Sequence, residues 1–279
     1  MSTIPKNIGI RLHDTIDGSF TEKLDFIQGQ GFSCIHLALS KAYPDAKVTD
    51  ASLTPGFAQK IRRELDDRGL DLAVLGCYLN LLNPDTEELK AVQAKYRAHI
   101  RFASMLGGGV VGTETGCPNR EYKPCDESYT EETLRKFIEN LKPVIADAEK
   151  MGVIFAIEPV WRHCVNTPER ARKVLDAIDS PNLQIIFDPV NLIGDVNYER
   201  APQIIHEAIE LLWKDVAVLH IKDYEVKDGK VVPAQLGKGL MDYTEIMENV
   251  KKDKPYVQMS LEETTPVNAR EGRLLIAGM

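Results

Sequence analysis

The chain has 279 residues, of which 43% are hydrophobic and 27% are charged, and its formal net charge is −8 at pH 7. This composition is typical of a globular protein with a large core, and it disfavours nucleic acid and anionic membranes as partners, since both usually require clustered Lys and Arg. The five cysteines are odd in number and widely spread, and residues 1–6 carry no apolar signal segment, so we expect a reducing, cytoplasmic location.

Short apolar runs alternate with amphipathic segments along the whole chain, which predicts eight strand–helix units. The strand candidates are 7–13, 32–39, 70–78, 109–114, 153–158, 183–188, 216–220 and 256–262. The helix candidates are 21–28, 55–68, 87–106, 130–150, 168–178, 199–213, 243–250 and 268–276. Glycines such as Gly69, Gly107 and Gly152 close helices just before the next strand begins.

Strict alternation of strand and helix predicts an α/β fold with parallel strands joined by right-handed crossovers. Eight such units close most economically into a (β/α)₈ barrel, the TIM barrel, and we expect residues 1–279 to form this single domain. An open doubly wound sheet is the alternative, but it gives no reason for eight units. It is further disfavoured because no Gly-x-Gly-x-x-Gly motif follows the first strand.

Four consecutive strand candidates end on a side chain that can bind a metal ion, namely Glu158, Asp188, His220 and Glu262. Side chains two positions apart share a face of a strand, so all four are expected to point toward the barrel axis at the C-terminal mouth, where catalytic residues of this fold lie. Three facing carboxylates would repel one another unless a cation lay between them. We therefore predict one divalent metal ion, and this mixed oxygen and nitrogen set fits Mn²⁺, Mg²⁺, Co²⁺ or Zn²⁺.

Other polar residues at or near strand ends are candidates for contacts with a substrate, namely His13, Glu114, Arg162, His163, Asn191 and Lys222. Arg162 suits an anionic or hydroxyl-rich group, and Lys222 shares the inward parity of His220. His36 lies within the second strand candidate and is equally consistent with a core histidine. The segment Gly237 to Gly239 is interpreted as a tight turn, with a phosphate-binding loop as the alternative.

Five motifs resemble those of the xylose isomerase-like barrel superfamily, and the resemblance spans essentially the whole chain. They are Ile157-Glu158-Pro159, the run from Phe187 to Leu192, His220 to Asp223, Leu236 to Gly239, and Ser260-Leu261-Glu262. Within the superfamily the chain is most similar to the sugar phosphate isomerase/epimerase group, which includes the ketose 3-epimerases. The resemblance implies that the four strand-end residues bind one divalent metal ion and that Glu158 and Glu262 also move protons.

The resemblance implies an isomerase or epimerase of a small sugar, sugar acid or sugar phosphate, acting by proton transfer through an enediolate, with Glu158 and Glu262 as catalytic residues. A metal-dependent dehydratase or other lyase of an inosose-like ketone would use the same cation. A non-catalytic sugar-binding barrel is a third alternative. An abasic-site endonuclease is disfavoured, because six histidines and a net charge of −8 supply neither a cluster of zinc ligands nor a basic DNA face. The expected partner is a small carbohydrate, and a homo-oligomer remains open.

Three positions depart from the ketose 3-epimerase pattern. Cys164 stands where those enzymes carry a second glutamate, and Asn191 stands where they carry a histidine after the sixth strand. No arginine follows the seventh strand within residues 222–226. The metal ligands are thus retained while the residues expected around the substrate differ, which leaves open the substrate, the metal, and the choice between epimerase, isomerase and dehydratase.

Overall fold

A computed structural model describes residues 7–43 and 48–279 of the chain. Eight parallel strands form a closed barrel, which confirms the predicted α/β barrel fold. In the order in which they pair around the barrel, these strands are β1 (Asn7–Arg11), β10 (Gln258–Leu261), β7 (Val216–Ile221), β6 (Leu183–Phe187), β5 (Phe155–Glu158), β4 (Val110–Glu114), β3 (Asp71–Gly76) and β2 (Cys34–Leu37).

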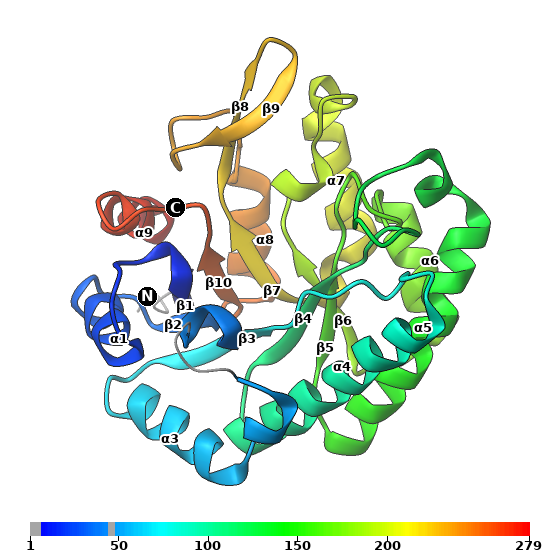
Figure 1. Cartoon of the computed structure of the whole chain (residues 1–279). Coiled ribbons are helices and arrows are strands. Elements are labelled where there is room, and N and C mark those ends of the chain that lie inside the picture. Colours follow the sequence, from blue (N-terminus) through cyan, green and yellow to red (C-terminus); the bar gives the residue numbers. More distant parts are fainter. Residues whose placement is uncertain (1–6, 44–47) are drawn as a thin grey trace.

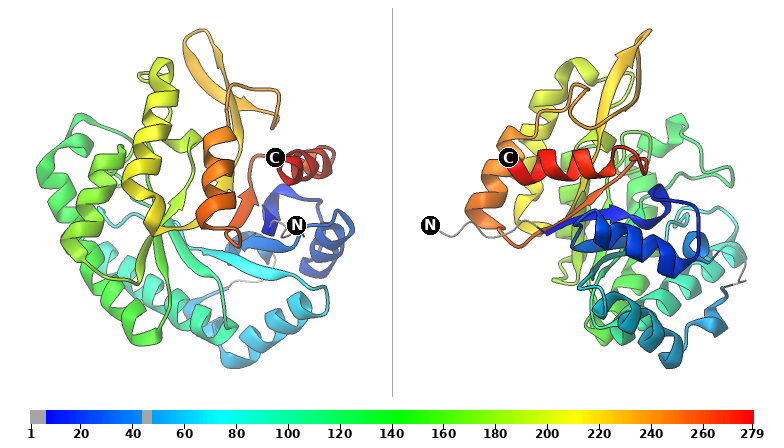
Figure 2. Two further views of the ribbon diagram at one scale, coloured as in Figure 1. Left: turned by 180° about the vertical axis from the view of Figure 1, so that it is seen from behind. Right: turned by 90° about the vertical axis from the view of Figure 1, so that its left-hand side faces the viewer.

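Helices surround the barrel, as Figures 1 and 2 show. They are α1 (Phe20–Gly29), α2 (Leu39–Ala42), α3 (Pro55–Asp66), α4 (Thr86–Leu106), α5 (Glu131–Met151), α6 (Pro168–Ile178), α7 (Ala201–Leu212), α8 (Thr244–Asp253) and α9 (Ala269–Gly278). Local chemistry sets many of their ends. Thr130 caps α5 by accepting a hydrogen bond from the backbone N–H of Thr133, and Gly152 ends the same helix in the left-handed conformation. Within the described residues no helix has the length and apolar character needed to cross a membrane.

The inside of the barrel is filled by small and branched side chains, namely Cys34, Ala73, Val74, Val110, Ala156, Ile186 and Val218. Ala156, Ile186 and Val218 lie two residues before Glu158, Asp188 and His220, respectively. Residues two apart share a face of a strand, so these three polar side chains point to the same inner side of the barrel as the apolar residues that precede them, at its mouth. This arrangement agrees with the inward direction predicted for them, and their ligand atoms lie within 4.8 Å of one another.

An antiparallel hairpin between β7 and α8 was not predicted. It consists of β8 (Asp223–Lys227) and β9 (Lys230–Ala234), and it projects from the rim of the barrel (Figure 1). Asp228 and Gly229 form its turn with φ angles of +51° and +74°, as a two-residue hairpin turn requires. Asp223 Oδ2 accepts hydrogen bonds from the backbone N–H groups of Gly237 and Gly239, both at 2.9 Å. The Gly237 to Gly239 segment is thus a turn held by Asp223.

The first two predicted strands extend too far at the mouth. β1 ends at Arg11, and His13 lies in the 3₁₀ turn Leu12–Asp14. β2 ends at Leu37, and Leu39 already begins α2. Apolar residues that follow each strand hide its boundary, because Leu12 after β1 and Leu39 after β2 are also buried in the core. His36 consequently lies close to the mouth of the barrel, where catalytic residues of this fold lie.

Candidate metal centre

Four ligand-type side chains meet at the mouth of the barrel. Glu158 ends β5, His220 lies one residue before the end of β7, and Asp188 and Glu262 directly follow β6 and β10. One ligand atom from each residue lies within 4.8 Å of those from the other three. Their exposed fractions are only 2%, 1%, 0% and 6% for Glu158, Asp188, His220 and Glu262, respectively. The structure therefore brings together all four predicted metal ligands.

The polar atoms of this cluster fit a cation. His220 Nδ1 lies 3.2 Å from Glu158 Oε1 and 3.4 Å from Glu262 Oε1. Asp188 Oδ1 accepts two backbone hydrogen bonds of 3.0 Å, and Asp188 Oδ2 forms an ion pair with Lys222. His220 Nε2, in contrast, is buried without a hydrogen-bond partner in the part of the chain that the structure describes. Buried polar atoms are rarely left unpaired, and three carboxylates with one imidazole are ligands that a divalent metal ion accepts. The residues present thus fit one such ion.

All three carboxylates of the cluster are ionised at neutral pH. Burial alone would raise the pKa of Glu158, but His220 beside it holds that pKa below its ordinary value. Burial would likewise raise the pKa of Glu262, but His220 and His36 hold it well below its ordinary value. Burial raises the pKa of Asp188 to about 6, against the effect of Lys222. The cluster therefore buries three carboxylates, and positive charge must compensate them. In the metal-free protein part of it comes from His220, whose pKa these carboxylates raise to about 9 against the effect of burial.

Lys222 supplies one of the compensating charges. Its ammonium lies 2.9 Å from Asp188 Oδ2 and 3.8 Å from Glu262 Oε2, and it donates a hydrogen bond of 2.8 Å to Asn191 Oδ1. Asn191 Nδ2 in turn donates to Glu158 Oε1 at 2.5 Å. Burial would lower the pKa of Lys222, but the surrounding carboxylates, Asp188 foremost, raise it above its ordinary value. Asn191 and Lys222, predicted as substrate contacts, thus also link the ligands to one another.

A cavity of about 520 Å³ opens above the cluster, which is a size suited to a small-molecule ligand. Among its lining residues are five of the six predicted substrate contacts, namely His13, Glu114, Arg162, Asn191 and Lys222. The sixth, His163, lies outside this lining and is 2% exposed. Its Nδ1 atom lies 3.8 Å from Glu114 Oε2, and its ring packs edge-on against Tyr122. His163 therefore supports Glu114 rather than facing the cavity.

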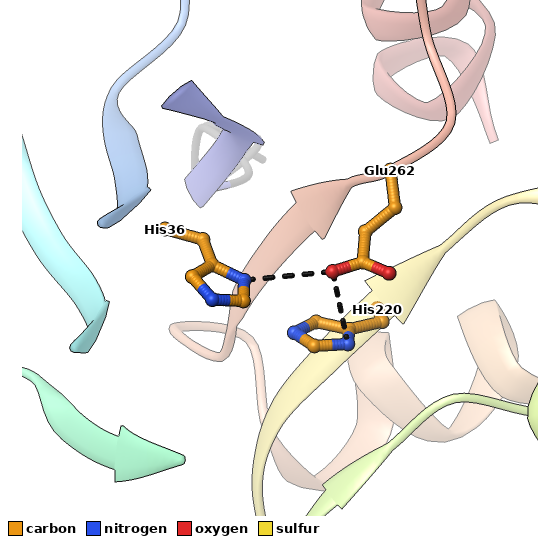
Figure 3. Close-up of side chains that lie close together, drawn as sticks. All are labelled: His36, His220 and Glu262. Atoms are coloured by element: carbon orange, nitrogen blue, oxygen red, sulfur yellow. Dashed lines mark ion pairs between the residues drawn. The ribbon is translucent and has the colours of Figure 1, made fainter. Parts of the chain in front are cut away.

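Sequence reasoning missed Arg11 and Tyr78 beside the two glutamates, and it left His36 open between a residue of the mouth and a core histidine. Arg11 Nη1 lies 3.3 Å from Glu262 Oε2, and His36 Nδ1 lies 3.5 Å from Glu262 Oε1, as Figure 3 shows for the histidine. Tyr78 donates a hydrogen bond of 3.4 Å to Glu158 Oε2. Arg11 ends β1 and His36 lies one residue before the end of β2. The predicted strands extend to residues 13 and 39, so the strand-end rule selects neither residue.

Cys164, at the position of the second epimerase glutamate, is fully buried. Its thiol donates to the backbone carbonyl of Thr115 at 3.5 Å, and burial raises its pKa to about 12. It is a protonated core thiol at neutral pH. The cavity therefore has no carboxylate from this position, and Glu114 of β4 is the additional carboxylate that lines it beside Glu158.

Glu114 predicts a pH dependence of stability. Burial, with Glu158 nearby, raises its pKa from 4.5 to about 7. The folded state thus holds this proton more tightly than the unfolded state, so stability falls as pH rises through the window from about 4.5 to about 7. We expect Glu114→Gln to stabilise the metal-free protein by about 1–3 kcal/mol at pH 8, and by much less at pH 5.

Urea unfolding of the metal-free protein at both pH values would measure this difference. The exposed Glu248 of α8 provides a matched control, because Glu248→Gln should change stability little at either pH. A larger gain at pH 5 than at pH 8 would contradict the sign derived for Glu114.

Comparison with protein-family models gives one match over nearly the whole chain. The family described as "Xylose isomerase-like TIM barrel" matches residues 24–277. A curated relative, the 3-oxo-isoapionate decarboxylase of Pectobacterium atrosepticum, is 34% identical over 102 residues, which cover 34% of this chain and 35% of that protein. The matched stretch therefore spans about a third of that relative's length.

Solved structures share the fold at low sequence identity. A D-tagatose 3-epimerase-like protein superposes with a TM-score of 0.74 at 19% identity, covering 98% of this chain and 96% of the other. The IolI protein with a bound zinc atom superposes with a TM-score of 0.71 at 17% identity, covering 98% and 95% of the two chains, respectively. At these identities the likeness concerns the fold.

Proposed function

The chain belongs to the xylose isomerase-like TIM barrel family, and from this premise we propose that it is a divalent-metal-dependent isomerase or epimerase of a small sugar, sugar acid or sugar phosphate. One observation carries the proposal: Glu158 and Glu262 come from strands on either side of β7 in the barrel, both carboxylates approach His220 Nδ1, at 3.2 and 3.4 Å, and both glutamates line the cavity. When bound by the four ligands, the metal ion would polarise a substrate carbonyl and lower the free energy of an enediolate.

The two glutamates are the proposed proton carriers. Glu158 would take a proton from the carbon next to the carbonyl, while Tyr78 and Asn191 hold its two oxygens. If Glu262 returned a proton to the opposite face, the product would be the epimer. If the proton returned to the neighbouring carbon, the product would be the aldose or ketose isomer. In either case the enzyme needs no redox partner, because only protons move.

The remaining lining residues are proposed to orient the substrate. His13, Glu114 and Arg162 surround the cavity with both donors and acceptors, which suits a molecule rich in hydroxyl groups. Lys222 and Asn191 lie closest to the cluster and would meet the oxygens next to the reacting carbon. His163 would act through Glu114, since its Nδ1 lies 3.8 Å from Glu114 Oε2 and it does not line the cavity.

A lyase is the second candidate, and the relative named as a decarboxylase favours it. Decarboxylation of a 3-oxo acid breaks the bond to the carboxylate carbon, releases CO₂ and leaves the bonding electrons in an enolate. A dehydratase of an inosose-like ketone would instead remove a proton and expel a hydroxyl group. Both reactions place negative charge on the same carbonyl oxygen, so the same cluster would serve them.

The test is an isotope-exchange assay. Protein loaded with Mn²⁺ is incubated in D₂O with a panel of ketoses, sugar acids and sugar phosphates, and products are analysed by mass spectrometry and NMR. We expect deuterium at a carbon next to the carbonyl of at least one substrate, and loss of exchange after metal removal by a chelator. CO₂ release or loss of water would identify a lyase. A panel that gives neither exchange nor release would contradict both candidates.

A further inference from the structure

The proposed reaction assigns no role to His36 of β2. It is 1% exposed and lines the cavity. Within the described chain its Nε2 has no hydrogen-bond partner, and its Nδ1 lies at the outer limit of hydrogen-bond distance from a carboxylate. That carboxylate belongs to Glu262, whose Oε1 lies 3.5 Å from His36 Nδ1 (Figure 3). A buried imidazole that faces a buried carboxylate usually has a task beyond packing.

The orientation of the His36 ring is fixed by its neighbours. The ring stacks between Tyr78 and His220, with centroid distances of 5.8 and 5.3 Å and interplanar angles of 26° and 19°, respectively. Its Nε2 edge lies against β3 at Gly76, where an added Cβ would come within 2.6 Å of Nε2. Nδ1 is therefore the ring nitrogen that faces the carboxylates, and the glycine makes this close approach possible.

Two tasks fit this geometry. Ligand atoms of His36, His220 and Glu262 lie within 4.8 Å of one another, so His36 could ligate an additional metal ion. Arg11 argues against such an ion, because its Nη1 lies 3.3 Å from Glu262 Oε2 and Asp14 fixes its Nε at 2.8 Å. A guanidinium on the same carboxylate repels a second cation. The other task is donation of a hydrogen bond.

We propose that His36 is a positioning residue that donates its Nδ1–H to Oε1 of Glu262. This bond fixes the plane of the carboxylate, so that Oε1 stays near His220 while Oε2 stays near Arg11 and Lys222, which both line the cavity. Groups that orient a metal ligand in this way tune both the metal and the reaction. The inference deepens the proposed function and rests on it for the catalytic readout, whereas the metal-binding readout is independent.

Two substitutions distinguish the effect of losing the hydrogen-bond donor of His36 from the effect of changing the size of its side chain. His36→Leu removes the donor, and His36→Asn returns an N–H close to the position of Nδ1. Titration of each protein with Co²⁺ gives the number of ions bound, the affinity and the visible absorption spectrum. We expect one ion per chain in all three proteins, an affinity about 10–100-fold weaker with an altered spectrum in His36→Leu, and a return to within a few-fold of wild type in His36→Asn.

Exchange kinetics add a second readout, in which kcat should fall about 10–100-fold in His36→Leu while KM changes only a few-fold. His206→Leu, which replaces an exposed histidine of α7, is the matched control and should leave every value unchanged. Should His36→Leu not fold, Gly76→Ala displaces the ring while keeping the histidine, and it should weaken Co²⁺ binding in the same direction.

The outcomes are distinguishable. Two ions per wild-type chain, one of them lost in His36→Leu, would make His36 a ligand and overturn the inference. Equal Co²⁺ affinity and spectra in wild type and His36→Leu would overturn it as well. If wild type shows no exchange with any substrate, the proposed function fails, and the Co²⁺ titrations still decide whether His36 positions Glu262.

Discussion

Glu158→Gln is expected to lower the rate of proton exchange by about 10²–10⁴-fold, the range that loss of a positioned base usually costs. The substitution keeps the length of the side chain and a carbonyl oxygen that can accept from Asn191 or Tyr78, so the barrel should fold as before. The metal ion should still bind, though more weakly, because one of three ligand charges is removed. Deuterium exchange and Mn²⁺ titration on the same sample measure both effects.

Testing each of the two epimers separately as a substrate makes this experiment more informative. If Glu158 and Glu262 serve opposite faces, Glu158→Gln should still exchange the proton of one epimer, and Glu262→Gln that of the other. If a single glutamate serves an isomerase, its replacement should stop exchange with both substrates. Glu248→Gln, on the exposed side of α8, controls for the loss of a charge. Exchange at the wild-type rate in both glutamine variants would show that neither Glu158 nor Glu262 transfers the proton.

The candidate metal cluster was accessible from sequence because two simple periodicities determine it. Alternation of strands and helices predicts the barrel, and the two-residue period of a strand turns Ala156, Ile186 and Val218 inward and thereby also Glu158, Asp188 and His220. Each of these inferences needs only the local pattern along one strand. The shared mouth of the barrel then brings distant residues together without any knowledge of their contacts.

The residues around the cluster were less accessible because they depend on strand boundaries and on contacts between strands. The predicted second strand ran to residue 39, which made His36 an interior position, whereas β2 ends at Leu37. The pairing of β2 with β3 also shifts register between Ile35 and His36. Arg11 meets Glu262 because β1 pairs with β10 at closure of the barrel. The hairpin β8–β9 has a usable sequence signal in Asp228-Gly229, a pair typical of two-residue hairpin turns, but no strand was predicted between residues 220 and 243.

Lys222→Met is expected to have effects of opposite sign on metal affinity and on folding. In the metal-free protein, loss of the ammonium leaves Asp188 and its neighbouring carboxylates uncompensated, which should cost about 3–5 kcal/mol of stability. The same loss removes a positive charge that repels a divalent ion, so Mn²⁺ should bind at least about tenfold more tightly. Urea unfolding without metal and calorimetric titration with Mn²⁺ measure the two effects.

Catalysis provides the third measurement on the Lys222→Met protein. Although it binds its metal more tightly, it should exchange substrate protons about 10²-fold or more slowly, because the cation beside the developing oxyanion is gone. Lys252→Met, on the exposed side of α8, is the matched control and should change none of the three values. Weaker Mn²⁺ binding in Lys222→Met would mean that the lysine holds Asp188 in place for the ion. Tighter binding with slower exchange would mean that one side chain stabilises the metal-free cluster, opposes the metal and assists the reaction.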